Sequence, residues 1–297
     1  MNALHNCGRA ETREPPSPEN GDRERRGPRR SAADPLAGLH WRRVPVPPAR
    51  DVRRLLPPSM PRRQRFETLY DTKMRNFERI EILANRGSAI AETLYECDAA
   101  SPCDLPACAR CARRYRIYFT GEALAVAHAY VGPHEFATIF LDTVEVGSLP
   151  EANVKRAHAA LRKRLDRSGF KGSVLVGGTE AAWIAADRHW ILHLHLLAIG
   201  VRPDSWERLR AKLDDFGLAV PLKVETLNDE ARQLSYITKF TTYHRPLKRG
   251  FDRPSPAFPL PPARLEELAT WWASHRFEDF GFLYGARRRG GRIALQD

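Results

Sequence analysis

The chain has 297 residues, of which 42% are hydrophobic, and it carries a formal net charge of +12 at pH 7. This length and composition favour one substantial domain or two small ones with tails. No apolar run reaches the length of a membrane span and the N-terminus lacks the apolar core of a secretory signal, which argues against a membrane protein and predicts a cytoplasmic location.

The excess of positive charge, with a sequence pI near 9.8, favours a polyanionic partner. Nucleic acid is the leading candidate for that partner. The alternative is a basic surface with no dedicated ligand.

The first 65 residues differ in composition from the rest of the chain. Eleven of the 23 prolines precede Arg62, and Trp41 is the only aromatic residue before Phe66. Such a segment cannot bury enough apolar surface to offset the entropy of ordering, which predicts a disordered basic arm over residues 1–65. Three further segments are predicted: a helical and Cys-rich segment over 66–130, a folded domain over 131–250, and a Pro-rich loop, helix and basic tail over 251–297.

Four cysteines follow the first predicted helical region: Cys97, Cys103, Cys108 and Cys111. The two-residue gap between Cys108 and Cys111 lets two thiolates bind one tetrahedral Zn²⁺, and the other two could complete the shell. A disulfide is disfavoured in a cytosolic chain, so the alternatives are zinc or four ordinary buried thiols. Cys7 stands outside this group.

Strand and helix patterns alternate through the next part of the chain. Ser148 and Glu151 have capping-box spacing, and they predict the start of a helix whose apolar stripe includes Val154 and Leu161. The predicted order is strand 136–141, helix 148–165, strand 173–180, strand 190–199, helix 206–216 stopped by Gly217, and strand 220–224. This order predicts an α+β, ferredoxin-like fold with an antiparallel sheet and helices on one face.

The strand over 190–199 combines a core face with two histidines. Because side chains alternate along a strand, Leu192, Leu194 and Leu196 share one face, while His193 and His195 point together from the other. Two imidazoles on one face can bind one cation. A pair of satisfied histidines without metal is the alternative.

Glu180 on the preceding strand is the candidate third ligand. A hairpin turn centred on the Ala186–Asp187 bond sets Glu180 opposite His193, and one centred on the Asp187–Arg188 bond sets it opposite His195. A turn centred on Asp187 itself would place Glu180 on the leucine face.

A helix is predicted from near Asn228, with Leu234 and Ile237 on one side and Tyr236, Lys239 and Tyr243 on the other. A phenol is a poor nucleophile at its reference pKa of about 10. Tyr236 could attack a phosphate if Lys239 supplied a nearby cation and a bound metal polarised the electrophile. Taken alone, both residues would be ordinary surface side chains.

Basic residues near these elements are the candidate DNA contacts. They are Arg110, Arg113 and Arg114, around the cysteines, and Lys155 and Arg162, on the helix over 148–165. A charged helix face that is merely solvated is the alternative.

Together these motifs resemble the rolling-circle plasmid replication initiators of the HUH endonuclease superfamily over about residues 97 to 245. Strand 136–142 is similar to the family's first motif, His193-Leu194-His195 to its His-hydrophobic-His motif, and Tyr236-Ile237-Thr238-Lys239 to its Tyr-x-x-Lys motif. The resemblance implies an HUH nickase domain over 131–250, with the cysteine group as a structural Zn²⁺ site before it.

The resemblance also implies an activity and partners. Glu180, His193 and His195 would hold Mg²⁺ or Mn²⁺, and Tyr236, assisted by Lys239, would nick single-stranded or hairpin plasmid origin DNA. The products would be a 5′-phosphotyrosine adduct and a free 3′ hydroxyl, which a host polymerase extends while a host helicase opens the duplex.

The chain departs from the family pattern at one position. Some relatives carry a carboxylate one turn before the tyrosine for termination, where this chain has Arg232, with Glu230 further ahead and Tyr243 as a possible second nucleophile. Two other functions stay open from the sequence: a transposase or relaxase of the same superfamily, and a non-catalytic zinc-containing DNA-binding regulator.

Overall fold

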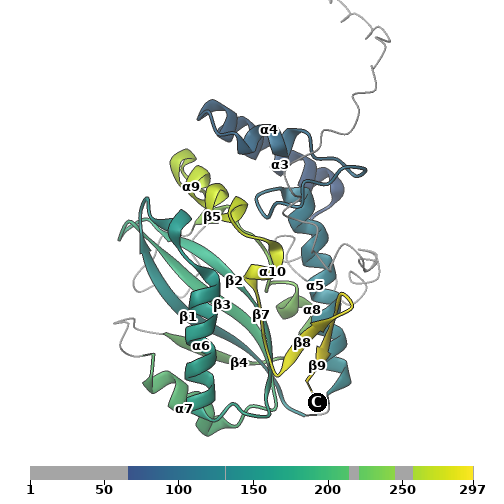
Figure 1. Ribbon diagram of the computed structural model, residues 1–297, viewed down its shortest axis with the longest axis vertical. Helices are drawn as coiled ribbons and strands as arrows, with labels where there is room; N and C mark the ends of the chain where they lie inside the picture. The colour runs from purple at the N-terminus through teal and green to yellow at the C-terminus, as the bar shows by residue number, and fades with distance from the viewer. Residues whose placement is uncertain (1–65, 131, 214–220, 245–256, 297) are drawn as a thin grey trace, which may run out of the picture. The chain divides into compact units, whose positions relative to one another are not determined.

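Figure 1 shows the computed structural model, in which residues 66–130, 132–213, 221–244 and 257–296 are described. All of them belong to one compact unit of the chain, which spans Leu36–Asp297. The predicted arm over 1–65, Cys7, Phe216 with Gly217, and the start of the Pro-rich loop lie outside the described residues. Among the helices described, none is both long and apolar enough to cross a membrane.

A five-stranded antiparallel sheet, in the order β4-β1-β3-β2-β7, forms the centre of this unit. Its strands are β1 (His134–Glu145), β2 (Val174–Ile184), β3 (His189–Ile199), β4 (Leu222–Thr226) and β7 (Gly281–Tyr284). The first four occur in the predicted order, with one helix between β1 and β2 and one between β3 and β4. The fifth, β7, pairs with β2 at the sheet edge and was not predicted, because residues 251–297 showed no strand pattern.

Helices α6 (Val154–Ser168) and α7 (Pro203–Ala211) pack on the leucine face of the sheet, where α6 lies in front in Figure 1. His158 of α6 contacts Thr179 of β2 through Nε2 and Oγ1 at 2.7 Å. The indole of Trp206 in α7 donates a hydrogen bond to Glu135 of β1 at 2.7 Å.

The start of α6 differs from the prediction. A short 3-10 turn, η2 (Leu149–Glu151), occupies the predicted first turn, and the α-helix begins at Val154 with Asn153 as its cap. The Asn153 side chain accepts the backbone N–H of Arg156 at 2.9 Å. The local amide acceptor therefore replaces the predicted capping box at Ser148.

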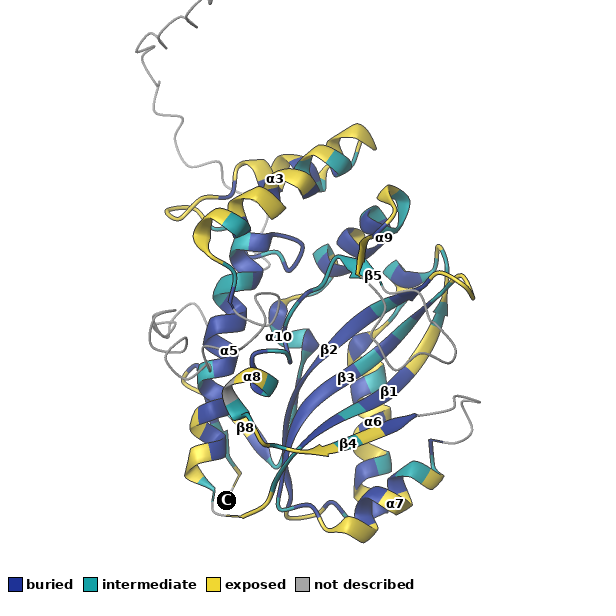
Figure 2. Cartoon of the chain, turned by 180° about the vertical axis from the view of Figure 1, so that it is seen from behind, coloured by how far each residue is buried: buried dark blue, intermediate teal, exposed yellow. Residues whose placement is uncertain are grey.

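The opposite face of the sheet is covered as well, over β2, by a segment without regular structure. The segment Ser235–Phe240, which follows α8 (Glu230–Leu234), lies directly on β2: a Cβ on Gly178 would come within 2.6 Å of the Ile237 carbonyl oxygen. Helix α5 (Ala109–Ala129) contacts this segment, since the Arg116 side chain donates to the Ser235 carbonyl at 2.6 Å. In Figure 2, seen from behind, the sheet lies in front of α6, and α8 and α5 lie to one side.

The helix predicted from near Asn228 is present as α8, but it ends at Leu234, and its predicted continuation over Tyr236–Tyr243 is wrong. The backbone turns through Ser235–Thr238, and Phe240 adopts a left-handed conformation with φ of +49°. Burial accounts for this strained residue: Phe240 is 5% exposed and packs edge-on against Trp272, Phe277 and Phe280. Tertiary packing thus overrides the local helical pattern.

The remaining elements are α3 (Leu69–Asn85), α4 (Ile90–Tyr95), β5 (Tyr243–His244), β6 (Phe258–Pro259), α9 (Pro262–Ala273), α10 (Phe277–Phe280), β8 (Ala286–Arg289) and β9 (Arg292–Leu295). Among them, α9 and α10 carry the rings of the aromatic cluster around Phe240. Helix α3 begins at a capping box between Thr68 and Asp71. Strands β5 and β6 pair with each other, as do β8 and β9.

The contact at Gly178 gives a test of how the Ser235–Phe240 segment is held. Gly178→Ala should destabilise the protein by about 1–3 kcal/mol, because the new methyl group must displace the Ile237 carbonyl. Urea unfolding measures this loss. Ala182→Ser, on the same strand and face, is the control and should change the free energy of unfolding by no more than about 0.5 kcal/mol; equal effects of both substitutions would contradict the prediction.

Candidate functional site

The β2–β3 hairpin sets the positions of the three predicted metal ligands. Glu180 pairs with His193, which is the first of the two productive registers and centres the turn on the Ala186–Asp187 bond. Leu192, Leu194 and Leu196 are buried on the α6 face, while His193 and His195 point to the opposite face.

The ligand atoms of Glu180, His193 and His195 all lie within 4.8 Å of one another. The Nε2 atoms of the two histidines are 3.0 Å apart. Two nitrogens and one carboxylate oxygen at this spacing can share one metal ion.

The other ring nitrogens of the histidines are held by neighbours. Nδ1 of His195 lies 2.9 Å from Oγ1 of Thr138, and Nδ1 of His193 lies 3.5 Å from the carbonyl of Ile191. A donor role for Nδ1 leaves Nε2 free of a proton and available as a ligand. Phe136 stacks on His195, with ring centroids 5.9 Å apart.

Sequence reasoning missed Thr138 and Phe136 as neighbours of the metal group. Their positions follow from the pairing of Thr138 with His195 across β1 and β3. The alternation of strand 136–141 could have placed both on one face, but the pairing of β1 with β3 was not assigned.

Burial favours the neutral forms of all three side chains. It lowers the pKa of His193 to about 4 and, with His193 and Lys239 adding to the effect, holds the pKa of His195 well below its usual value. Burial also raises the pKa of Glu180 to about 7, against the opposing effect of the Lys239 charge. The histidines are thus unprotonated at neutral pH, as metal ligation requires.

Glu180 also fixes the segment that carries the tyrosine. Its Oε1 atom accepts the backbone N–H of Lys239 at 3.0 Å. The same carboxylate is therefore both a candidate ligand and the attachment point of the Ser235–Phe240 segment to the sheet.

Tyr236 lies against the candidate metal group. Its ring meets the His195 ring edge-on, with centroids 4.9 Å apart. The ammonium of Lys239 lies 5.0 Å from the Tyr236 ring centroid and donates to the Tyr243 hydroxyl at 2.8 Å. The structure thus brings Tyr236, Lys239 and Tyr243 together without the predicted helix.

Glu230, considered from sequence for termination chemistry, has other contacts. Its carboxylate lies 3.0 Å from Nε2 of His128 and 3.3 Å from Nδ1 of His134. It is not one of the three side chains that converge as the candidate metal group.

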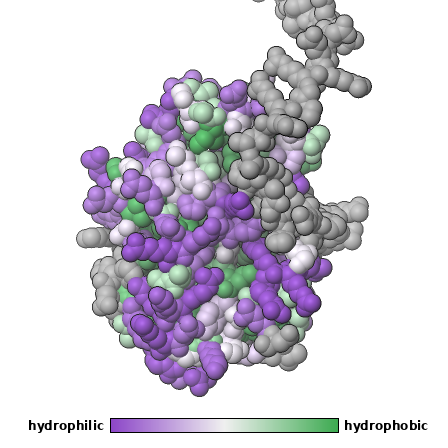
Figure 3. Space-filling model, viewed as in Figure 1, coloured by the Kyte–Doolittle hydropathy of each residue, from purple (hydrophilic) through white to green (hydrophobic). Residues whose placement is uncertain are grey.

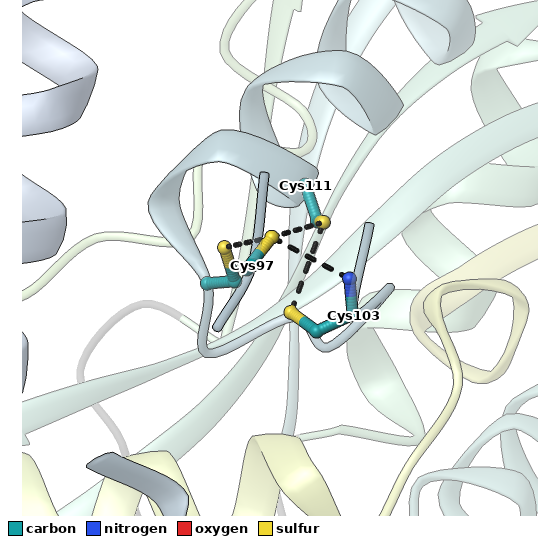
Figure 4. Close-up of side chains that lie close together, drawn as sticks. Cys97, Cys103 and Cys111 are labelled. Atoms are coloured by element: carbon teal, nitrogen blue, oxygen red, sulfur yellow. Dashed lines mark hydrogen bonds between the residues drawn. The ribbon is translucent and has the colours of Figure 1, made fainter. Parts of the chain in front are cut away.

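The four predicted cysteines form the second candidate metal group (Figure 4). The sulfur of Cys97 lies 3.5 Å from that of Cys108 and 3.7 Å from that of Cys111, and the Cys103 and Cys111 sulfurs are 3.9 Å apart. Cys97, Cys103 and Cys108 lie between α4 and α5, with Cys108 as the N-cap of α5, and Cys111 lies in the first turn of that helix.

Backbone groups donate to these sulfurs. The N–H of Cys103 points to the Cys97 sulfur at 3.4 Å, and the N–H of Asp104 points to the Cys111 sulfur at 3.3 Å. Hydrogen bonds among the four thiols lower the pKa of Cys97 and Cys108 and raise the pKa of Cys103 and Cys111. In the absence of a metal, two of the four thiols are therefore favoured as thiolates, which are the metal-binding form of cysteine.

The predicted DNA contacts fall into two sets. Arg110 donates to the Cys97 carbonyl, Arg113 donates to the Glu67 carbonyl at 2.7 Å, and Arg114 is half-buried on α5. Lys155 pairs with Asp279 at 3.0 Å, and Arg162 lies over the Phe282 ring.

Lys155 and Arg162 belong to α6, across the sheet from the candidate metal centre. The molecular face that carries α6 is largely hydrophilic in Figure 3. The prediction that these two residues bind DNA gains no support from their position.

The raised pKa of Glu180 predicts how metal binding depends on pH. Below about pH 7 a metal ion must displace a proton from Glu180, so Mn²⁺ affinity should rise with pH and level off above about 7. Between pH 5 and 7 the slope should be about tenfold per unit, since one proton is released. Calorimetric titration of Mn²⁺ measures it.

Glu180→Gln should weaken Mn²⁺ binding and remove this slope. Glu225→Gln, which changes an exposed carboxylate of β4 paired with Lys223, is the matched control and should keep both affinity and slope. A slope that survives in Glu180→Gln would assign the proton to another group.

Comparison of the chain with protein-family models, with curated protein sequences and with solved structures finds no match.

Proposed function

We propose that this protein is an HUH-type nickase that initiates rolling-circle replication of a plasmid. The observation that carries the proposal is the contact of Tyr236 with His195, whose ring nitrogen converges with a ring nitrogen of His193 and a carboxylate oxygen of Glu180. A phenol, a cation and a three-ligand metal group in one place fit phosphoryl transfer by tyrosine better than DNA binding alone.

The sheet supports the same proposal. Strands β1 to β4, in the spatial order β4-β1-β3-β2 with crossovers through α6 and α7, have the ferredoxin-like arrangement expected of the HUH fold. The His-Leu-His motif lies on β3, an inner strand, which gives the metal group a rigid base.

Two histidine nitrogens and one carboxylate fit Mg²⁺ or Mn²⁺. When bound, such an ion supplies positive charge to a non-bridging oxygen of the scissile phosphate. Thr138 and the Ile191 carbonyl orient the imidazoles, and the buried Glu180 keeps the ligand set compact.

In the proposed reaction the Tyr236 hydroxyl oxygen forms a bond to phosphorus while the bond from phosphorus to the 3′ oxygen breaks. The phenol gives up its proton and the leaving 3′ oxygen gains one. Lys239, whose ammonium lies 5.0 Å from the Tyr236 ring centroid, stabilises the negative charge on the phenolate.

The covalent 5′-phosphotyrosine is itself a phosphodiester and conserves the energy of the bond that breaks, so the strand can be rejoined without ATP. The free 3′ hydroxyl serves as the primer for a host polymerase, and a host helicase separates the strands. Single-stranded or hairpin origin DNA is the substrate that the half-buried Tyr236 requires, since a strand held in the duplex could not reach it.

The cysteine group fits a structural Zn²⁺. Four sulfurs at about 2.3 Å from a tetrahedral zinc lie about 3.8 Å apart, close to the separations of 3.5 to 3.9 Å observed here. We assign it a structural role because four sulfur ligands leave no open position for a substrate.

The nickase is tested with a pool of single-stranded oligonucleotides, Mn²⁺ and the purified protein. A covalent protein–DNA adduct that survives denaturing electrophoresis should form, and Tyr236→Phe should abolish it while binding persists, because only the attacking oxygen is lost. Mass spectrometry of the digested adduct locates the modified residue.

Tyr95→Phe is the control for substitution of an exposed tyrosine, and it should leave adduct formation unchanged. Tyr243→Phe should still form the adduct, but more slowly, because the Lys239 ammonium loses its hydrogen bond to the Tyr243 hydroxyl. Retained binding with no adduct under any divalent metal would overturn the nickase and leave a DNA-binding protein.

The zinc assignment predicts about one Zn²⁺ per chain by elemental analysis. Cys108→Ser should release it and lower the thermal midpoint, because the free energy of metal binding is part of the folding free energy. Cys7→Ser, outside the four-cysteine group, should change neither. Four freely titratable thiols in the native protein, with no zinc, would contradict the assignment.

A further inference from the structure

A pocket of arginines adjoins the segment that carries Tyr236. We call it the arginine pocket; its charged lining residues are Arg75, Arg79, Arg113, Arg116, Lys239 and Glu67. Five cations thus surround one carboxylate. The remaining free volume is about 20 Å³, little more than one water molecule occupies.

The Glu67 carboxylate occupies the place of an anion in this pocket. Nη1 of Arg116 lies 3.1 and 3.0 Å from its two oxygens, and Nη1 of Arg75 lies 2.8 Å from one of them. Guanidinium groups bind carboxylates and phosphates through the same planar array of donors. A phosphate oxygen can therefore replace each of these contacts.

Arg79 also lines the pocket and keeps one donor without an acceptor in the described part of the chain. This side chain is 6% exposed and donates to the carbonyls of Ala107 and Phe240. Its Nε atom is buried and has no hydrogen-bond partner among the described residues. A buried donor without an acceptor is costly, so a larger anion with more oxygens would be favoured here.

The pocket is connected to the tyrosine through the backbone. Arg116 donates to the carbonyl of Ser235, the residue before Tyr236, and Lys239 belongs both to the pocket lining and to the surroundings of the Tyr236 ring. A phosphate in the pocket would thus flank one held at the metal group.

We propose that the arginine pocket binds a backbone phosphate of single-stranded DNA next to the phosphate attacked by Tyr236, and that Glu67 holds this place until DNA binds. The proposal rests on the nickase function for the identity of the strand. The arginine pocket would then be closed to DNA by Glu67 until a DNA phosphate displaces the Glu67 carboxylate.

The exchange requires the Glu67 side chain to leave the pocket. The Glu67 side chain is 12% exposed and Arg75 is 49% exposed, which places the Arg75 side of the pocket toward solvent. Helix α3 is capped by Thr68 and Asp71, not by the Glu67 side chain. Rotation of Glu67 outward therefore leaves the helix start intact.

Fluorescence anisotropy with a labelled single-stranded oligonucleotide, in the presence of EDTA, tests the pocket without cleavage. Glu67→Gln should tighten binding about 3- to 10-fold, because the competing charge is removed while the arginines stay. Arg75→Gln should weaken binding by about the same factor and lower the slope of log Kd against log salt by about 1.

The matched controls are Glu207→Gln and Arg210→Gln, an exposed ion pair on α7. Neither should shift the oligonucleotide affinity as the pocket variants do. If Glu67→Gln binds DNA like the wild type or more weakly, Glu67 is a structural clamp and the proposal is overturned. Should Glu67→Gln fail to fold, Arg75→Gln, which keeps the Glu67–Arg116 pair, decides the question by its affinity and salt slope.

The outcome is separable from that of the nickase test. Affinity shifts in the predicted directions without any adduct would support the pocket and reject the nickase. Adduct formation with unchanged affinities in Glu67→Gln and Arg75→Gln would support the nickase and reject the pocket.

Discussion

The hydrogen bond from the Lys239 backbone to the buried Glu180 carboxylate joins the two halves of the candidate site. One half is the β2–β3 hairpin with its histidines, and the other is the Ser235–Phe240 segment with Tyr236. A shift of one residue in the hairpin register would turn Glu180 to the leucine face and remove both a metal ligand and this attachment. The register is therefore the constraint on which the rest of the site depends.

The Ser235–Phe240 segment has no regular structure of its own, and its position comes from contacts on three sides. Gly178 allows its backbone to approach β2, Arg116 binds the Ser235 carbonyl from α5, and the buried Phe240 ring holds its far end in the aromatic cluster. These contacts replace the backbone hydrogen bonds of the helix that the sequence pattern predicts. They hold Tyr236 in place on an irregular segment, since each is buried and each involves a different element.

Alternation along two strands was enough to predict the metal group, because side-chain direction in a strand is a local property. It placed His193 with His195 and limited Glu180 to three registers, one of which is present. The helix over Tyr236–Tyr243 failed for the opposite reason: Phe240 takes a left-handed conformation that only distant aromatic rings stabilise. Strand β7 and the place of Glu67 among arginines also depend on contacts between residues far apart in the sequence, and no local pattern encodes them.

The basic residues of the chain differ in what they contact. Arg79 and Arg116 are almost fully buried and bind backbone carbonyls, whereas Lys155 and Arg162 are exposed on α6, across the sheet from Tyr236. Judged by exposure and charge alone, Lys155 and Arg162 would be the expected DNA contacts. Yet a buried guanidinium has already lost its hydration, so its attraction for a phosphate is less screened than that of an exposed one. The strongest anion site of such a protein can therefore be formed by its least exposed arginines, provided that a removable carboxylate such as Glu67 compensates them until the ligand arrives.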